Sequence, residues 1–472
     1  MTFSAPARHL HLLLGLVVIL GACDGRSVIG QQTGTGGGAG HGTGGAGGGA
    51  GHAPIGGSGG TAGTGNSAGT GNSAGTGNSA GAGNGPGVDA GDGCQGNSPD
   101  AGVTFGAAVQ YATRGAPGSL ALGDLNGDGK ADLAFTIVFN QSGAGGVTGS
   151  GPSGAGGGPP PSRGVGVLLS DTSAGFAAPQ YYAVDGMAYS VAVGDLNGDG
   201  KPDLAVTNSQ SVEVLFNTGD GVLASPVSFA TGSMPNQVAI GDLNGDGKAD
   251  LAVANGGTGN GDGDVAVLLN MGAGTFVAAN YPAGTAPYGV AIGDLNGDGS
   301  PDLAVASGTG VRVLLNNGNG TFGAAASYGS GTNPLAVAIG DLNGDGKADL
   351  AVSPDSASGA SVLLNLGNGT FAAAVNYTFI YNPNYSGGSG VVIGDLNGDG
   401  KPDLVGVPAT GSSCGVAYVL FNSGNGTFAA PVFIAIGPVA NSIALQDLNG
   451  DGELDLVTSN STGVGVLLNA GP

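Results

Sequence analysis

Residues 240–253 read IGDLNGDGKADLAV, and close copies of this stretch occur six more times along the chain. After the first interval, the copies recur about every fifty residues, a period typical of propellers and other repeat architectures. The first interval is longer because it holds a Gly/Pro-rich insertion, residues 140–164. The seven copies begin at Asp124, Asp195, Asp242, Asp294, Asp341, Asp395 and Asp447.

Each repeat contains four short apolar runs. In the third repeat these are VAIGDL (238–243), DLAVAN (250–255), DVAVLLN (264–270) and GTFVAANY (274–281). Their length and their Val and Ile content predict β-strands, and the Asn-Gly pair in the recurring link NxGNGTF favours a hairpin turn. Four strands per repeat predict one propeller blade.

The two ends of the chain hold complementary parts of one repeat. The last repeat stops after its third run, VGVLLNAGP (464–472), and a fourth run, TFGAAVQY (104–111), precedes the first motif. We therefore expect the N-terminal strand to complete the last blade and to remove an open sheet edge. The predicted fold is all-β, a seven-bladed propeller over residues 100–472.

The segment before the propeller has a different composition. Residues 1–22 have the pattern of a signal peptide, because Arg8 precedes an apolar run too short to span a bilayer. LGAC (20–23) resembles the lipobox of bacterial lipoproteins, which implies cleavage before Cys23 and a lipid on that residue; an ordinary secretory signal is the alternative. Residues 23–99 are dominated by Gly, Ala, Ser, Thr and Asn and predict a disordered tether. We expect an exported protein, periplasmic or at the cell surface, held to the membrane by its lipid only.

Two further cysteines, Cys94 and Cys414, lie in an exported context that permits disulfides. One hypothesis is that they pair and fix the start of the propeller. The alternative is two unpaired thiols.

The motif has the pattern of an ion-binding loop. Numbered from its first Asp, it has Asp at positions 1, 5 and 9, Asn at 3 and Gly at 6. Side chains at 1, 3 and 5 converge when such a loop curls around an ion, and the backbone carbonyl of position 7 can join them. These hard oxygen donors predict up to seven Ca²⁺ ions, with Mg²⁺ as second choice, and the lack of His and Cys argues against zinc or copper. The predicted ligands are Asp124, Asn126, Asp128, Lys130 and Asp132; Asp195, Asn197, Asp199, Lys201 and Asp203; Asp242, Asn244, Asp246, Lys248 and Asp250; Asp294, Asn296, Asp298, Ser300 and Asp302; Asp341, Asn343, Asp345, Lys347 and Asp349; Asp395, Asn397, Asp399, Lys401 and Asp403; and Asp447, Asn449, Asp451, Glu453 and Asp455.

An EF-hand has a similar opening but needs a Glu at position 12, whereas this chain has residues such as Phe135 and Val253 there. DLNGDGKADLAV, followed by VLLNxGNGTFxAA, instead resembles the FG-GAP/VCBS repeats of bacterial surface proteins, which are similar to the calcium-bearing blades of the integrin α-subunit propeller. The resemblance covers residues 101–472. It implies calcium loops between the first two strands of each blade. It leaves function open, because the family includes adhesins, carbohydrate-binding modules and enzyme accessory domains.

Composition narrows the function classes. The net charge of −23 disfavours nucleic acid as a partner. All four His lie before residue 53, so we expect no catalytic residue in the propeller and no enzyme. We predict a binding or adhesion module for a glycan or protein ligand, of open oligomeric state. An enzyme or accessory domain acting on an extracellular polysaccharide is the alternative.

A ligand site is expected where the repeats differ. The residue two positions before the first strand's initial apolar residue is expected to face the rim opposite the motif loops, at the mouth of the channel. Aromatic and amide side chains there, Tyr189, Asn236, Tyr288 and Asn441, are the candidate ligand-binding residues; ordinary loop variation is the alternative. The full set of these positions is Gly118, Tyr189, Asn236, Tyr288, Leu335, Ser389 and Asn441.

Overall fold

The structure is a computed structural model. It describes residues 102–138, 163–172, 175–258, 262–308, 310–331, 333–353, 358–379, 388–408, 415–437 and 440–471. The predicted signal peptide and tether, Cys23, both cysteines of the hypothetical disulfide, and most of the 140–164 insertion lie outside these residues. Within the described part of the chain, no helix is long and apolar enough to cross a membrane.

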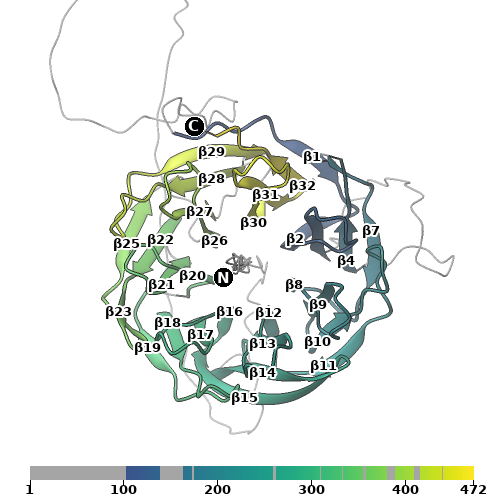
Figure 1. The fold of residues 1–472 in the computed structure, drawn as a ribbon, viewed down its shortest axis with the longest axis horizontal. Coiled ribbons are helices and arrows are strands. Elements are labelled where there is room, and N and C mark those ends of the chain that lie inside the picture. Colours follow the sequence, from purple (N-terminus) through teal and green to yellow (C-terminus); the bar gives the residue numbers. More distant parts are fainter. Residues whose placement is uncertain are drawn as a thin grey trace, which may run out of the picture. The chain divides into compact units, whose positions relative to one another are not determined.

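Seven four-stranded antiparallel sheets form a ring of blades, as predicted (Figure 1). The first strand of each blade lies nearest the centre of the ring and the fourth lies at its circumference. From inside outward, the blades are β2 (Ala116–Gly123), β3 (Asp132–Val138), β4 (Gly164–Leu168) and β7 (Gln180–Ala183); β8 (Ser190–Gly194), β9 (Asp203–Thr207), β10 (Ser211–Leu215) and β11 (Val227–Ala230); β12 (Pro235–Gly241), β13 (Asp250–Asn255), β14 (Asp262–Gly272) and β15 (Thr275–Thr285); β16 (Pro287–Gly293), β17 (Asp302–Ser307), β18 (Gly310–Leu314) and β19 (Ala326–Tyr328); β20 (Ala336–Gly340), β21 (Asp349–Ser353), β22 (Ser358–Leu363) and β25 (Val375–Phe379); β26 (Gly388–Gly394), β27 (Asp403–Pro408), β28 (Gly415–Leu420) and β29 (Val432–Gly437); and β30 (Ala440–Gln446), β31 (Asp455–Asn460), β32 (Gly463–Leu467) and β1 (Val109–Ala112).

The links from third to fourth strand are short hairpins. Two of them carry their own two-stranded ladders, β5 (Ser170–Thr172) with β6 (Gly175–Phe176) and β23 (Asn365–Gly367) with β24 (Thr370–Phe371). Others have a single bridge at the same place, such as Asn316 with Phe322. The links from third to fourth strand are therefore hairpins, as the sequence predicted.

The last blade is completed from the other end of the chain, as expected. β1 pairs antiparallel with β32, from Val109 opposite Val466 to Ala112 opposite Gly463. Just before β1, Phe105 forms a bridge with Asn469. The ring thus closes through hydrogen bonds between strands far apart in sequence.

The chain direction divides the ring into two rims. In every blade the first strand ends just before the motif and the second begins at its position 9; in the third blade Gly241 pairs with Asp250. Because neighbouring strands are antiparallel, the motif loops and the third-to-fourth hairpins share one rim, which we call the aspartate rim. The second-to-third hairpins and the links between blades share the other, which we call the variable rim.

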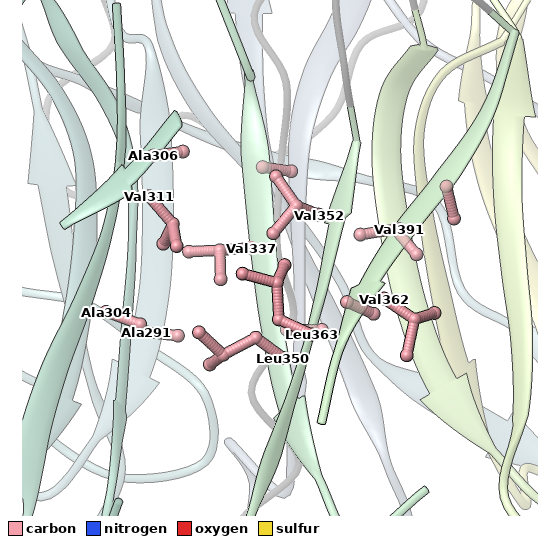
Figure 2. Packing of buried hydrophobic residues seen from close by; sticks show 14 of the residues in the cluster. Ala291, Ala304, Ala306, Val311, Val337, Leu350, Val352, Val362, Leu363 and Val391 are labelled. Atoms are coloured by element: carbon pink, nitrogen blue, oxygen red, sulfur yellow. The ribbon is translucent and has the colours of Figure 1, made fainter. Parts of the chain in front are cut away.

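The core lies between adjacent blades, where Val, Leu, Ile and Ala from facing sheets interdigitate (Figure 2). A glycine ends the first strand of six blades and allows the next blade to approach closely. A Cβ on Gly241 would lie 3.2 Å from Ile292 Cγ2, and one on Gly293 would lie 3.0 Å from Ile339 Cγ2. The seventh blade has Gln446 at this position. Side chains rather than an open gap therefore join the blades.

Candidate functional site

Each motif folds as a tight loop around its first aspartate. In the third copy, Asp242 Oδ1 accepts hydrogen bonds from the backbone N–H groups of Gly245 and Asp246 (2.8 and 3.2 Å), and Oδ2 accepts one from Gly247 (2.8 Å). Asn244 Oδ1 accepts from the Asp246 N–H at 2.9 Å. Gly245 and Gly247 have φ of 73° and 81°, a region that glycine adopts without strain. Positions 1, 3 and 5 therefore face one another across a single turn.

Position 9 is set apart from this group. Asp250 is fully buried; its Oδ2 accepts from the Leu243 N–H at 2.8 Å and its Oδ1 from the Asn270 N–H at 2.6 Å. Burial, which disfavours the charged form, outweighs these donors and raises the pKa of the Asp250 carboxyl. The same cause raises the pKa of Asp203, Asp302, Asp349 and Asp403 to about 6. Position 9 thus anchors the loop to the third-to-fourth hairpin of its own blade.

An asparagine at the start of that hairpin joins neighbouring blades, a role that the sequence analysis missed. Asn316 in blade 4 donates from Nδ2 to the Leu243 carbonyl in the motif loop of blade 3 (2.7 Å) and to the Pro301 carbonyl in its own loop (2.8 Å). The sequence signal for this role was the first Asn of NxGNGTF, which the sequence analysis interpreted only as part of a turn. We call the six residues of this kind the bridging asparagines: Asn217, Asn270, Asn316, Asn365, Asn422 and Asn469.

The loops have the donor chemistry of a calcium site. Positions 1, 3 and 5 offer two carboxylates and an amide carbonyl on the partly exposed side of one turn, and such hard oxygens suit Ca²⁺. Among the described residues, however, no three acidic, histidine or cysteine side chains converge closely enough to hold a metal by themselves. An ion in these loops would therefore need amide, backbone or water oxygens as well. With such additional oxygen donors, the loop residues fit Ca²⁺.

Position 7 adds a second feature. In four copies its lysine ammonium pairs with the aspartate at position 5, as in Lys248 Nζ to Asp246 Oδ2 at 2.6 Å. The other three pairs join Lys201 to Asp199, Lys347 to Asp345 and Lys401 to Asp399. A cation in these loops would compete with the ammonium for that carboxylate. Ser300 in the fourth copy offers no such competitor.

The variable positions of the repeats lie at the start of the first strands, on the variable rim. In blade 4 Pro287 pairs with Ser307 and Gly289 with Ala306, so Tyr288 is the extra residue of a β-bulge. Asn236 and Asn441 occupy the same bulge in blades 3 and 7. Tyr189 directly precedes β8, and its N–H bonds the Thr207 carbonyl at 2.9 Å. The first strands surround the centre of the ring, so these four residues lie around its mouth (Figure 1).

The two asparagines among them have partners within the ring. Asn236 Nδ2 donates to the Pro287 carbonyl of the next blade at 2.7 Å, and Asn441 Nδ2 donates to the Pro117 carbonyl at 3.1 Å. The Tyr288 side chain is 36% exposed. At this rim the amides therefore link blades, and Tyr288 presents an aromatic surface to solvent.

Charge is divided unequally between the rims. All five lysines of the propeller lie at position 7 of a motif loop, beside most of the acidic residues. The arginines of the described chain lie elsewhere: Arg114 between β1 and β2, Arg163 just before β4, and Arg312 in the middle of β18. Arg114 and Arg163 belong to the variable rim, and the Arg312 side chain lies beside Gly284 and Ser307 at the same end of the blades. The variable rim also carries acids such as Asp185 and Asp262. The aspartate rim is strongly anionic and the variable rim is mixed.

A ring of seven four-stranded blades, each with an aspartate loop between its first two strands, defines a repeat propeller. A family model described as FG-GAP-like repeat matches residues 195–253, 253–305, 294–352 and 346–406, and one described as FG-GAP repeat matches residues 116–151. The chain belongs to the FG-GAP repeat proteins. This propeller is a fold used for ligand binding.

The chain is similar to solved structures at low sequence identity. The BBS1N chain, solved in complex with ARL6DN, is 13% identical with a TM-score of 0.50, over 78% of this chain and 97% of that one. A lectin of Agrocybe aegerita, described as recognising non-reducing terminal N-acetylglucosamine, is 20% identical with a TM-score of 0.46, over 76% of this chain and 86% of that one. No curated protein matches the chain.

Proposed function

We propose that this chain is a calcium-stabilised binding or adhesion module, tethered to a cell surface, whose variable rim holds a glycan or protein ligand. The observation that carries the proposal is the contrast between the two rims. One rim repeats the same aspartate loop seven times, which suits a scaffold. The other varies at the equivalent position, with Gly, Tyr, Asn, Leu and Ser among the seven blades, which suits recognition of a particular partner.

Calcium is proposed because the loops gather charge that lacks a counter-ion. Of the 29 acidic residues after residue 101, 21 are the three aspartates of the seven motifs. Only four of the copies have a lysine that pairs with position 5 among the described residues. A bound cation would offset the repulsion within each loop and the cost of burying position 9.

Binding is favoured over catalysis by the side chains that are present. Residues 100–472 contain no histidine, and their acids outside the motifs are few and scattered. The tether and the lipid on Cys23 are part of the proposal, because they would hold the propeller outside the cell and leave it able to reach a partner. The lipid would be its only membrane attachment.

Calorimetric unfolding tests the calcium part. With a Kd of about 10⁻⁴–10⁻³ M, each site would contribute about 0.4–1.4 kcal/mol at about 1 mM Ca²⁺, so seven sites together raise the melting temperature strongly. Asp246→Asn should reduce this rise in melting temperature by the contribution of about one site. Asp220→Asn, an acid of the aspartate rim outside the motifs, should leave it intact. An unchanged melting temperature after chelation would contradict the proposal.

Ligand screening tests the binding part. The purified propeller is tested against arrays of glycans and of surface proteins, with and without Ca²⁺, and any glycan that binds is assayed for turnover. Tyr189→Ala and Tyr288→Ala should weaken binding of the ligand found. Full binding by both variants would place the ligand away from the variable rim, and turnover would favour an enzyme.

A further inference from the structure

Blade 4 has an arginine without a counter-ion at the variable rim. Arg312 is partly buried, is the middle residue of β18, and takes part in none of the ion pairs formed among the described residues. Nor does its guanidinium donate a hydrogen bond to any of them. Arginine stays charged in proteins, so the partial burial of Arg312 costs hydration that no partner among the described residues restores.

A buried hydroxyl without a partner lies beside this arginine. Ser307, the last residue of β17, is 0% exposed, and its Oγ has no hydrogen-bond partner. The point where a Cβ on Gly284 would stand is 2.8 Å from Arg312 Nε and 3.0 Å from Ser307 Oγ. Gly284 has φ of 89°, and its missing side chain lets both groups lie against the link between blades 3 and 4. An unsatisfied buried hydroxyl costs free energy, which a ligand acceptor would recover.

An exposed aromatic ring lies on the inner side of the same blade end. Tyr288 is the bulged residue of β16, directly after Pro287, which pairs with Ser307. The Asn236 amide of blade 3 donates a hydrogen bond to the Pro287 carbonyl and so stabilises the bulge from the neighbouring blade. Bulges commonly aim a side chain at a binding site. The first, second and third strands of blade 4 therefore present Tyr288, Ser307 and Arg312 in that order.

The spacing suggests the size of a ligand. Neighbouring strands lie about 4.8 Å apart and Arg312 lies two residues beyond Gly310, the partner of Ser307, so the backbones of Tyr288 and Arg312 are about 11 Å apart. This distance suits two linked sugar rings better than one. Ser307 and Arg312, the donors on the second and third strands, suit a carboxylate. A guanidinium binds the two oxygens of a carboxylate side by side.

We propose that Tyr288, Ser307 and Arg312 form a subsite for an acidic glycan, with the carboxylate of one uronic acid on Arg312 and Ser307 and the neighbouring sugar ring against Tyr288. The subsite rests on the proposed function, since it gives the variable rim a ligand class. Asp262 starts β14 and pairs with Thr285, next to Gly284. This exposed carboxylate would repel the ligand.

Isothermal titration with a uronic-acid disaccharide and tetrasaccharide tests the subsite, and their methyl esters are matched neutral ligands. The acids should bind at least tenfold more tightly than the esters. Arg312→Gln should weaken binding of the acids at least tenfold and bring acid and ester to the same affinity. Ser307→Ala and Tyr288→Ala should weaken it less, and Asp262→Asn should strengthen it. Melting temperatures report whether each variant remains folded.

Arg163→Gln is the matched control, since Arg163 is an exposed arginine of the same rim in blade 1. It should leave binding of the acids unchanged. Equal binding of acids and esters by the unaltered propeller, or full binding of the acids by folded Arg312→Gln, would overturn the subsite. If neutral glycans bind and Arg312→Gln has no effect, the proposed function stands and the subsite does not. An acidic hexapeptide that binds through Arg312 while uronic acids do not would assign the arginine to a protein partner instead.

Discussion

The junction between blade 7 and blade 1 differs from the other six. At each of those six, a bridging asparagine of one blade bonds the motif loop of the blade before it, as Asn316 does to the Leu243 carbonyl. At the seventh junction blade 1 has Ser170 in that place, and among the described residues its hydroxyl donates only to Asp128 and Asp132 of its own loop. Blade 7 also has Gln446 where the other first strands end in glycine.

Contacts of kinds that recur at other junctions hold the seventh junction without a bridging asparagine. The Asn441 amide donates a hydrogen bond to the Pro117 carbonyl, and the Ser459 hydroxyl donates one to the Gly118 carbonyl. Tyr111 of β1 packs edge-on against Phe176 of blade 1, with ring centroids 5.3 Å apart. The comparison teaches that six junctions rely on a repeated local device, whereas the seventh depends on a strand from the other end of the chain.

Removing β1 should have the largest effect. Deletion of residues 102–112 leaves β32 with an unpaired edge and removes Tyr111 from its contact with Phe176. We expect a loss of about 5 kcal/mol or more, a large part of the stability of an ordinary protein, and a greater tendency to aggregate. Calorimetry and light scattering measure the two effects.

A permuted chain sharpens this result. Residues 102–112, joined after residue 471 by a short Gly/Ser linker, should restore the lost stability, because β1 then reaches β32 from the other side. A deletion variant that melts at the original temperature would show that β1 does not close the ring.

Loss of one bridging asparagine should have an intermediate effect. Asn316→Ala leaves the buried Leu243 carbonyl and the partly buried Pro301 carbonyl without their donor, which we expect to cost about 3 kcal/mol. Asn317→Ala is the control, since the exposed Asn317 amide bonds only Thr321 Oγ1 and its loss should cost less than about 0.5 kcal/mol. Denaturant unfolding compares the two. Equal costs would mean that the bridging bonds do not stabilise the junction.

Adding the missing asparagine should have the smallest effect. Ser170→Asn places an amide where the other six blades have one, within a hairpin of the same kind, and should stabilise the protein by about 1 kcal/mol. Ser170→Ala removes the hydroxyl without adding the amide and should give no gain. A Ser170→Asn variant less stable than the original would indicate that the seventh junction is too different to accept the bridge.

The repeat pattern predicts most of this fold from sequence, because period, strand length and the split repeat all point to a closed ring. It also locates the aspartate loops and the bulge positions of the variable rim. The bridging asparagines were not predicted, because their Asn-Gly context explains them as turn residues and the partner carbonyl is about seventy residues away, beyond local pattern. Of the proposed subsite, the sequence indicated Tyr288 but not Ser307 or Arg312, for a related reason. Serine and arginine are unremarkable in a strand until the fold places them together.

The entry of the chain through β1 has a mechanical consequence. Whatever precedes residue 102 is covalently joined to the strand that completes blade 7, so a pull on a held propeller is applied first to the pairing of β1 with β32. Only four residue pairs form that pairing. Tension that separates them would open the ring at the junction without a bridging asparagine, while the aspartate loops of the other blades stay linked. The point of attachment would then also be the point of mechanical release.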